Sequence, residues 1–173
     1  MSEENTIETV AELLAHAKAI ETEAHDRYLE LAEQMETHHN LEVAQLFAKM
    51  AHIESLHIEK IIERIGETEL PHIPPWEYQW QGREAPEAVI SVDVHYMMTP
   101  YHALKLAMRA ETRACEFFSR IAASSTDPDL LSLAQELKEE EEEHIELLKA
   151  WIAKVPKPED GWDDDPDPPI LPA

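Results

Sequence analysis

Two short motifs in the sequence place a histidine three residues after a glutamate. They are Glu54-Ser-Leu-His57 and Glu141-Glu-Glu-His144. On a helix, residues three apart lie on the same face, so each motif can present a carboxylate and an imidazole to one ion. Iron and manganese accept these donors, and zinc accepts them too. The motifs therefore indicate metal chemistry, provided that they lie on helices that face one another.

The helix-breaking residues leave segments that are long enough for such helices. Glycine occurs at three positions and proline at twelve, and neither occurs in residues 1–65, 101–127 or 129–155. These stretches are rich in Ala, Leu, Glu and Lys, which favour helix, and a polar break divides the first of them at residues 37–40. We predict four helices, over the approximate ranges 6–37, 41–65, 100–124 and 128–154.

Residues that cap helices stand at the expected starts. Asn5 and Glu8 have the spacing of a capping box for the first helix, and Asn40 can cap the second. Thr99 and Asp127 each precede a proline, and proline is well suited to the first position of a helix. These signals support the predicted boundaries.

The segment between the second and third predicted helices, residues 67–99, is much longer than the turns on either side of it. A connection of this length suits a crossover that runs along a bundle and joins two helical hairpins. It contains Trp76, Tyr78 and Trp80. We expect these aromatic side chains to pack against the helices rather than to form a ligand-binding site.

Proline and acidic residues dominate the C-terminal segment. Residues 156–173 contain six prolines and six acids, and a segment of this composition buries too little apolar surface to fold. We predict a disordered acidic tail after a single domain of residues 1–155. The alternative is an interaction segment with Trp162, Ile170 and Leu171 as apolar anchors. The predicted fold class is all-α, a four-helix bundle made of two helical hairpins.

Each predicted helix carries an apolar stripe that is interrupted by a glutamate near its middle. Apolar residues recur at spacings of three and four, as on one face of a helix. An unpaired buried carboxylate is costly, so four of them in one core require cations or protons. The polar residues on the stripes are Glu21, Tyr28, Glu54, His57, Glu111, Glu141 and His144.

Two antiparallel hairpins bring the four glutamates to one level. Glu21 and Glu54 are equally distant from the first turn, and Glu111 and Glu141 are equally distant from the second. At ~1.5 Å per residue, each pair lies roughly 22 to 25 Å from its own turn. Because the crossover places the turns at opposite ends, both pairs fall near mid-bundle. Four carboxylates there balance two divalent ions, and two neutral imidazoles complete the donor set.

The chain also repeats itself. Residues 108–114 resemble residues 18–24, at an offset of 90, and Phe118 then corresponds to Tyr28. The two Glu-x-x-His motifs are offset by 87. Two copies of one helical hairpin predict a pseudo-twofold metal site.

Three other residues lie near the predicted site. Tyr28 stands two turns from Glu21 on the same stripe, either as a core tyrosine or as a hydroxyl that hydrogen-bonds a ligand carboxylate. His25 follows Glu21 by four residues, and we expect a partly exposed side chain on the flank of the helix. Cys115 is expected to be a small core or boundary residue.

The overall composition excludes several kinds of partner. The 37 acids against 14 Lys and Arg give a formal charge of −23, which argues against nucleic acid and anionic membranes. No apolar run approaches the ~20 residues that span a bilayer, and residues 1–10 do not read as a signal peptide. The single Cys115 excludes an internal disulfide and fits a reducing compartment. We expect a cytoplasmic protein.

This pattern resembles the ferritin-like superfamily and, more narrowly, stand-alone rubrerythrin-like di-iron domains without a rubredoxin domain. The resemblance covers residues from about 10 to 152 and depends on the two Glu-x-x-His motifs with their partner glutamates. It implies two iron ions, with manganese or a mixed pair possible. It also implies the ligand roles, with bridging Glu54 and Glu141, terminal Glu21 and Glu111, and one histidine per metal, His57 and His144.

The sequence departs from cage-forming ferritins in one place and from typical rubrerythrins in two. They carry an extra glutamate one turn beyond the third-helix ligand, where this chain has Ala114. They also carry a rubredoxin domain with a four-cysteine iron, which the single Cys115 rules out. Cage-forming ferritins add a fifth helix where this chain has its proline-rich tail, so a storage shell of many subunits is not expected.

The resemblance implies a non-haem di-iron oxidoreductase that reduces hydrogen peroxide or dioxygen, supplied with electrons by a separate donor protein. The alternative is an iron-binding carrier or ferroxidase module that handles iron without sustained redox turnover. A homodimer is expected, since bundles of this family commonly pair through their outer faces.

Overall fold

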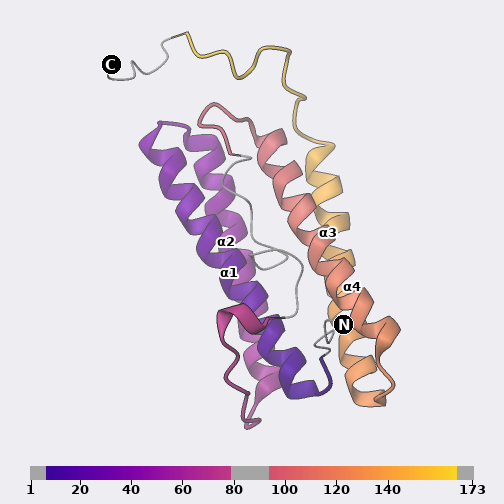
Figure 1. The fold of residues 1–173 in the computed structure, drawn as a ribbon. Helices are drawn as coiled ribbons and strands as arrows, with labels where there is room; N and C mark the ends of the chain where they lie inside the picture. The colour runs from indigo at the N-terminus through magenta and orange to yellow at the C-terminus, as the bar shows by residue number, and fades with distance from the viewer. Residues whose placement is uncertain (1–6, 79–93, 167–173) are drawn as a thin grey trace.

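The computed structural model describes residues 7–78 and 94–166 and is built from four long helices (Figure 1). No strand occurs within these two ranges, so the all-α prediction is confirmed. A short 3-10 turn, Pro75–Glu77, lies in the crossover. The helices are α1 (Val10–Thr37), α2 (Leu41–Ile65), α3 (Pro100–Ser124) and α4 (Pro128–Ile152).

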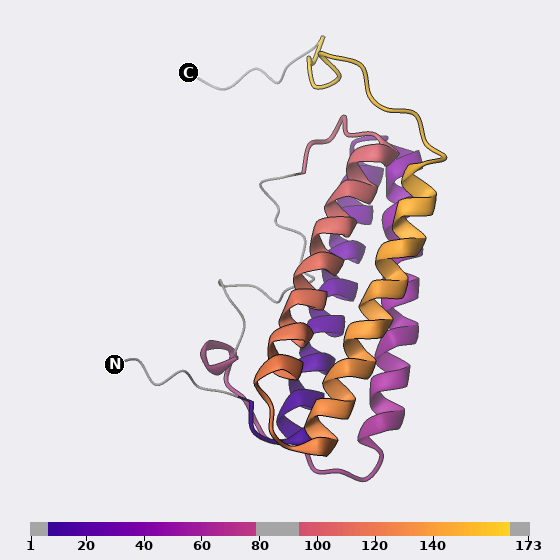
Figure 2. The same ribbon diagram turned by 90° about the vertical axis from the view of Figure 1, so that its right-hand side faces the viewer.

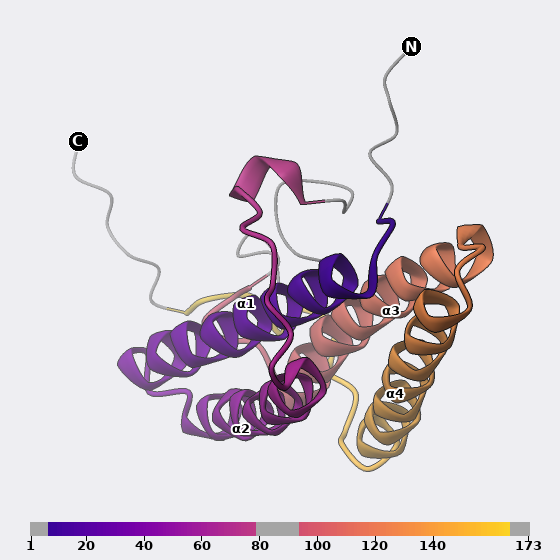
Figure 3. The same cartoon turned by 90° about the horizontal axis from the view of Figure 1, so that it is seen from below.

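The helices form two antiparallel hairpins, α1 with α2 and α3 with α4, whose turns lie at opposite ends of the bundle (Figures 1 and 2). Seen from below, α1 lies beside α3 (Figure 3), and the rings of His16 and Phe117 stack between them at 6.0 Å. On the opposite side α2 faces α4, where the Lys49 ammonium lies 4.2 Å from the Trp151 ring. No described helix is long and apolar enough to cross a membrane.

The first helix begins later than its sequence pattern predicts. Thr9 has an extended backbone and its hydroxyl accepts the Glu12 N–H at 3.1 Å, so it caps α1. Glu8 precedes the helix, and Asn5 lies outside the described residues. The prediction of a start near residue 6 is therefore wrong, because the capping side chain is Thr9.

The other predicted caps stand where they were expected. The side-chain oxygen Oδ1 of Asn40 accepts the Val43 N–H, and its side-chain Nδ2 donates to the backbone carbonyls of Tyr96 and Met98 at 3.1 and 2.8 Å. Asn40 thus also ties the end of the crossover to the first turn. Asp127 caps α4 through its carboxylate, which accepts the N–H groups of the next two non-proline residues.

The apolar core consists of two separate clusters. The first-turn cluster, next to the α1–α2 turn, includes Tyr28, Leu31, Phe47, Leu104 and Leu148. The second-turn cluster, next to the α3–α4 turn, includes Leu13, Ile20, Ile61, Phe118 and Leu137. The four stripe glutamates lie between these clusters along the helices, as the predicted mid-bundle layer requires.

The crossover aromatics behave differently from one another. Trp76 is 81% exposed, so the prediction that it packs against the helices is wrong. The Tyr78 ring meets the buried His16 ring edge-on at 5.1 Å, as expected. Trp80 lies outside the described residues.

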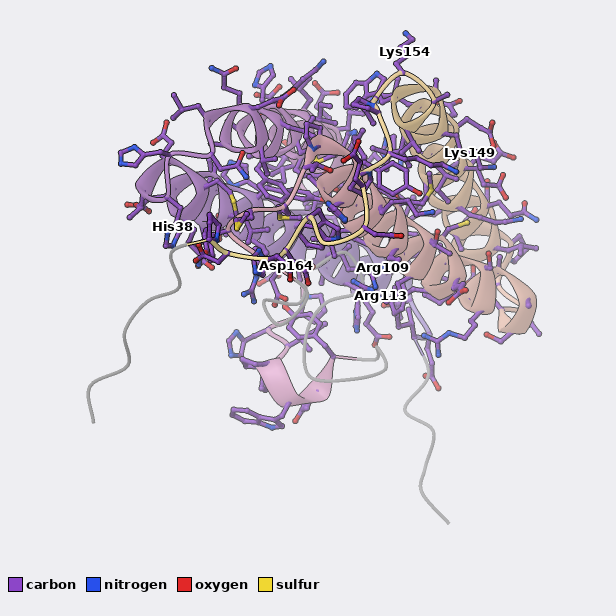
Figure 4. The ribbon with its side chains drawn as sticks, turned by 90° about the horizontal axis from the view of Figure 1, so that it is seen from above. His38, Arg109, Arg113, Lys149, Lys154 and Asp164 are labelled. Atoms are coloured by element: carbon purple, nitrogen blue, oxygen red, sulfur yellow. The ribbon has the colours of Figure 1, made fainter. Side chains whose placement is uncertain are left out.

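The C-terminal tail contains no helix or strand over residues 156–166, and it crosses the end of the bundle that carries the α1–α2 turn. Figure 4 looks down on this end and shows the tail passing from Lys154 towards Asp164. Within it, the Trp162 ring lies 3.8 Å from the ring of His102 and joins the first-turn cluster. The other predicted anchors, Ile170 and Leu171, lie outside the described residues.

Candidate metal centre

The structure brings the six predicted ligands together in two clusters. Within each cluster, one possible ligand atom from every residue lies within 4.8 Å of the others. Each takes a glutamate from the first helix of a hairpin and a Glu-x-x-His motif from the second. The α1–α2 cluster is Glu21, Glu54 and His57, and the α3–α4 cluster is Glu111, Glu141 and His144.

The same histidine nitrogen faces the carboxylates in both clusters. In the α1–α2 cluster, His57 Nδ1 lies 3.2 Å from Glu54 Oε2 and 3.4 Å from Glu21 Oε2. In the α3–α4 cluster, His144 Nδ1 lies 3.3 and 3.4 Å from the corresponding oxygens of Glu141 and Glu111. The two clusters are therefore nearly identical, as the sequence repeat predicts.

The histidines also join the two clusters. The rings of His57 and His144 stack across the α2–α4 contact with their centroids 4.0 Å apart and their planes at 7°. Because each ring turns its Nδ1 to its own carboxylates, two ions bound in the clusters would be neighbours. This arrangement can form a dinuclear centre.

The donor groups are almost completely removed from solvent. The four glutamates are between 1% and 6% exposed, while the side chains of His57 and His144 are 12% and 17% exposed. Buried carboxylates at this density require compensating positive charge. Divalent cations supply that charge and also satisfy the oxygens.

Glu111 and His144 influence each other's ionisation in the α3–α4 cluster. Burial acts to raise the pKa of Glu111, but hydrogen bonds with His144 and Glu141 outweigh it and the pKa is lowered. Burial likewise acts to lower the pKa of His144, but the hydrogen bond with Glu111 and the nearby carboxylate charges raise it. A metal ion bound at His144 would compete with protons for the ring nitrogen.

The donor set fits iron or manganese. Two carboxylates and one imidazole per cluster are oxygen-rich ligation without thiolate. Ala114, where typical rubrerythrins have an additional glutamate, is fully buried in the second-turn cluster. The third helix therefore offers only Glu111 to the site.

Comparison with known proteins agrees with this geometry. The family model for rubrerythrin matches residues 12–152. The chain belongs to the rubrerythrin family. No match is found among the curated proteins.

One solved structure is similar over most of this rubrerythrin-family chain. It is the crystal structure of an uncharacterized conserved protein from Magnetospirillum magnetotacticum MS-1, with 44% sequence identity and a TM-score of 0.66. The match covers 87% of this chain and 98% of that chain. The predicted resemblance to stand-alone rubrerythrin-like domains is confirmed.

The three other residues that the sequence placed near the site have different surroundings in the structure. Tyr28 is 2% exposed, stacks on Phe47 at 6.1 Å and lines a small cavity together with Glu54 and Glu111. His25 instead directs Nδ1 to Asp26 at 2.9 Å. Cys115 is half-buried on the flank of α3. Only Tyr28 is thus placed beside the two clusters.

Sequence reasoning missed two apolar residues next to the centre. Ile53 and Leu147 line the same cavity as Tyr28, but each stands one position before a stripe residue and so was not singled out. The offset of 87 between the second helices of the hairpins pairs them with charged residues, Glu140 and Lys60; this difference in polarity is the one signal of them in the sequence.

Proposed function

We propose that this rubrerythrin-family chain is a non-haem di-iron oxidoreductase that reduces hydrogen peroxide or dioxygen. The observation that carries the proposal is the pair of matched clusters, each with two buried carboxylates and one imidazole, joined by the His57–His144 stack. When bound, two ferrous ions would supply two electrons, which with two protons reduce hydrogen peroxide to two waters or dioxygen to hydrogen peroxide.

The residues of the chain would bind the two ions and balance their charge. Glu21, Glu54 and His57 would bind one ion, and the equivalent residues of the other hairpin would bind the second. Their negative charge offsets the metal charge, and the apolar clusters above and below exclude bulk water. Tyr28 would hydrogen-bond a ligand carboxylate and hold its orientation.

Anaerobic loading with ferrous iron tests the proposal. The natural chain should bind about two ions, and Glu54→Ala and Glu141→Ala should each reduce this stoichiometry, since each removes a buried donor. Glu142→Ala is the matched control, because Glu142 belongs to the same acidic run but its side chain is 51% exposed and pairs with Lys138. Iron binding that survives both ligand substitutions unchanged would contradict the proposal.

The strongly acidic surface favours a second candidate function, an iron carrier or ferroxidase module. A formal charge of −23 raises the local concentration of cations and accelerates their association at low salt. Single-turnover mixing of the ferrous-loaded protein separates the two functions. Oxidation by peroxide that is far faster than oxidation by dioxygen favours the peroxidase, and the reverse favours the ferroxidase.

We further propose the setting in which this chemistry takes place. We propose that sustained turnover draws electrons from a donor outside residues 1–173, because these residues contain one cysteine and cannot form a four-cysteine iron centre. We propose a homodimer in the cytoplasm without nucleic-acid or membrane partners. Sedimentation of the purified protein checks the dimer.

A further inference from the structure

A small cavity opens beside the metal centre. It measures about 20 Å³, and its polar wall consists of Tyr28 and three predicted ligands, Glu54, Glu111 and His144. Leu147, 44% exposed, brings it to the protein surface between α2 and α4. The remaining walls are apolar and consist of Met50, Ile53, Ala107, Leu147, Leu148 and Trp151.

The sequence repeat identifies the equivalent place on the other side of the centre. With the offset of 87 between α2 and α4, the equivalents of Ile53 and Trp151 are Glu140 and Arg64. These two residues form a salt bridge across the α2–α4 contact. Arg64 also lies 3.7 Å from Glu136.

Two further pairs of equivalent residues differ between the two sides of the metal centre. The equivalent of the apolar Leu147 is Lys60, and the equivalent of Tyr28 is Phe118, which is fully buried in the second-turn cluster. A wider hollow does lie near Arg64, but none of the predicted ligands lines it. Among the residues that the structure describes, the open apolar face of the centre is therefore the one at Ile53 and Trp151.

We propose that this cavity is the route by which the oxidant reaches the metal centre, and that it admits hydrogen peroxide or dioxygen but not alkyl hydroperoxides. The inference rests on the proposed function and names its class of substrate. The Arg64–Glu140 salt bridge closes the equivalent route on the other side.

Size and polarity both support this class of substrate. A cavity needs roughly 10–15 Å³ to hold one water molecule, so about 20 Å³ accommodates a molecule of two oxygen atoms but not a branched alkyl group. Apolar walls disfavour ions, because a charge loses its hydration there. A small neutral oxidant meets both requirements.

Filling the mouth of the cavity tests the route. In Leu147→Trp the indole should occupy the opening, and oxidation of the ferrous-loaded protein by peroxide and by dioxygen should slow by about tenfold or more, with unchanged iron stoichiometry. Lys60→Trp is the matched control, since it places the same indole at the equivalent position on the closed side. Its rates should equal those of the natural chain.

Enlarging the cavity tests the size selection. Trp151→Ala should raise the rate with tert-butyl hydroperoxide, relative to the rate with hydrogen peroxide, by about tenfold. Circular dichroism and iron stoichiometry show whether the variant is folded. An unchanged ratio in a folded, loaded variant would overturn the size selection.

Xenon provides a readout that does not depend on activity, because it binds apolar cavities. Crystals of the protein under xenon pressure should show the gas between Ile53, Leu148 and Trp151, and Leu147→Trp should displace it. If neither oxidant oxidises the loaded natural chain, the proposed function is overturned. If each oxidant oxidises Leu147→Trp as fast as it oxidises the natural chain, the access route alone is overturned. Xenon that binds only outside this cavity would also overturn the access route.

Discussion

His57 and His144 stack face to face at 4.0 Å although 87 residues separate them in the chain. Each imidazole directs Nδ1 to the two carboxylates of its own cluster. The stack therefore joins two equivalent half-sites, one from each hairpin.

Removing either histidine should affect one half-site and spare the other. We predict that His57→Gln and His144→Gln each lower anaerobic iron binding from about two ions per chain to about one, because each removes the single nitrogen donor of its cluster. Iron analysis after gel filtration measures this. Complete loss of both ions in one variant but not in the other would show that the half-sites are not equivalent.

Tyr28 and Phe118 occupy equivalent positions in the two hairpins, so the tyrosine hydroxyl is the difference between them. We predict that Tyr28→Phe keeps the fold and the iron stoichiometry, because the phenyl ring fills the same space. Oxidation by peroxide should slow by about tenfold, because the hydroxyl orients a ligand carboxylate. Stopped-flow absorbance measures the rate. A rate equal to that of the natural chain would assign Tyr28 to packing alone.

Burial of His16 predicts an acid-sensitive stability. The ring is 2% exposed and its Nδ1 donates to the Glu12 carbonyl at 2.7 Å, and burial lowers the pKa of His16 from its usual value. The unfolded chain therefore binds a proton more readily, so stability falls as the pH drops below about 6.5. Urea unfolding between pH 7.5 and 5 measures this slope.

A comparison of two variants isolates the His16 contribution. His16→Gln should flatten the slope between pH 7.5 and 5, because glutamine does not titrate. His52 is exposed on α2, so His52→Gln should retain the slope of the natural chain. Equal slopes in all three proteins would mean that groups other than His16 determine the acid sensitivity.

Among the residues that the structure describes, the two tryptophans outside the long helices predict opposite results. Trp162 packs on His102 at 3.8 Å, so Trp162→Ala should lower the free energy of unfolding by about 1–2 kcal/mol. Trp76 is 81% exposed, so Trp76→Ala should change it by less than about 0.5 kcal/mol. Thermal unfolding compares the variants. A Trp162→Ala protein as stable as the natural chain would show that the tail does not stabilise the bundle.

Much of the fold follows from local pattern. The apolar stripes and the distances from the turns are properties of single helices and hairpins, and they were sufficient to group Glu21 with Glu54 and Glu111 with Glu141. The start of α1 was missed because Thr9, like Asn5, is a good capping residue, and choosing between them depends on where the first turn of the helix finds packing partners.

Features that depend on the distance between the two hairpins could not be predicted from the patterns of single helices. Whether Ile53 leaves a cavity beside Trp151, and whether Arg64 reaches Glu140, depends on how closely α2 approaches α4. No residue pattern along one helix encodes that distance. The exposure of Trp76 has a similar origin, because the path of the crossover depends on contacts that its own sequence does not specify.

The separation of the core into two apolar clusters has a consequence for how long the protein persists in a cell. The layer between them contains four buried carboxylates, so a chain without metal carries mutually repelling charges at its centre and should open there at a lower cost than the metal-bound chain. Bound ions raise the cost of that opening by mass action. Proteases that act on opened chains would then remove the empty protein first, and its abundance would follow the supply of metal.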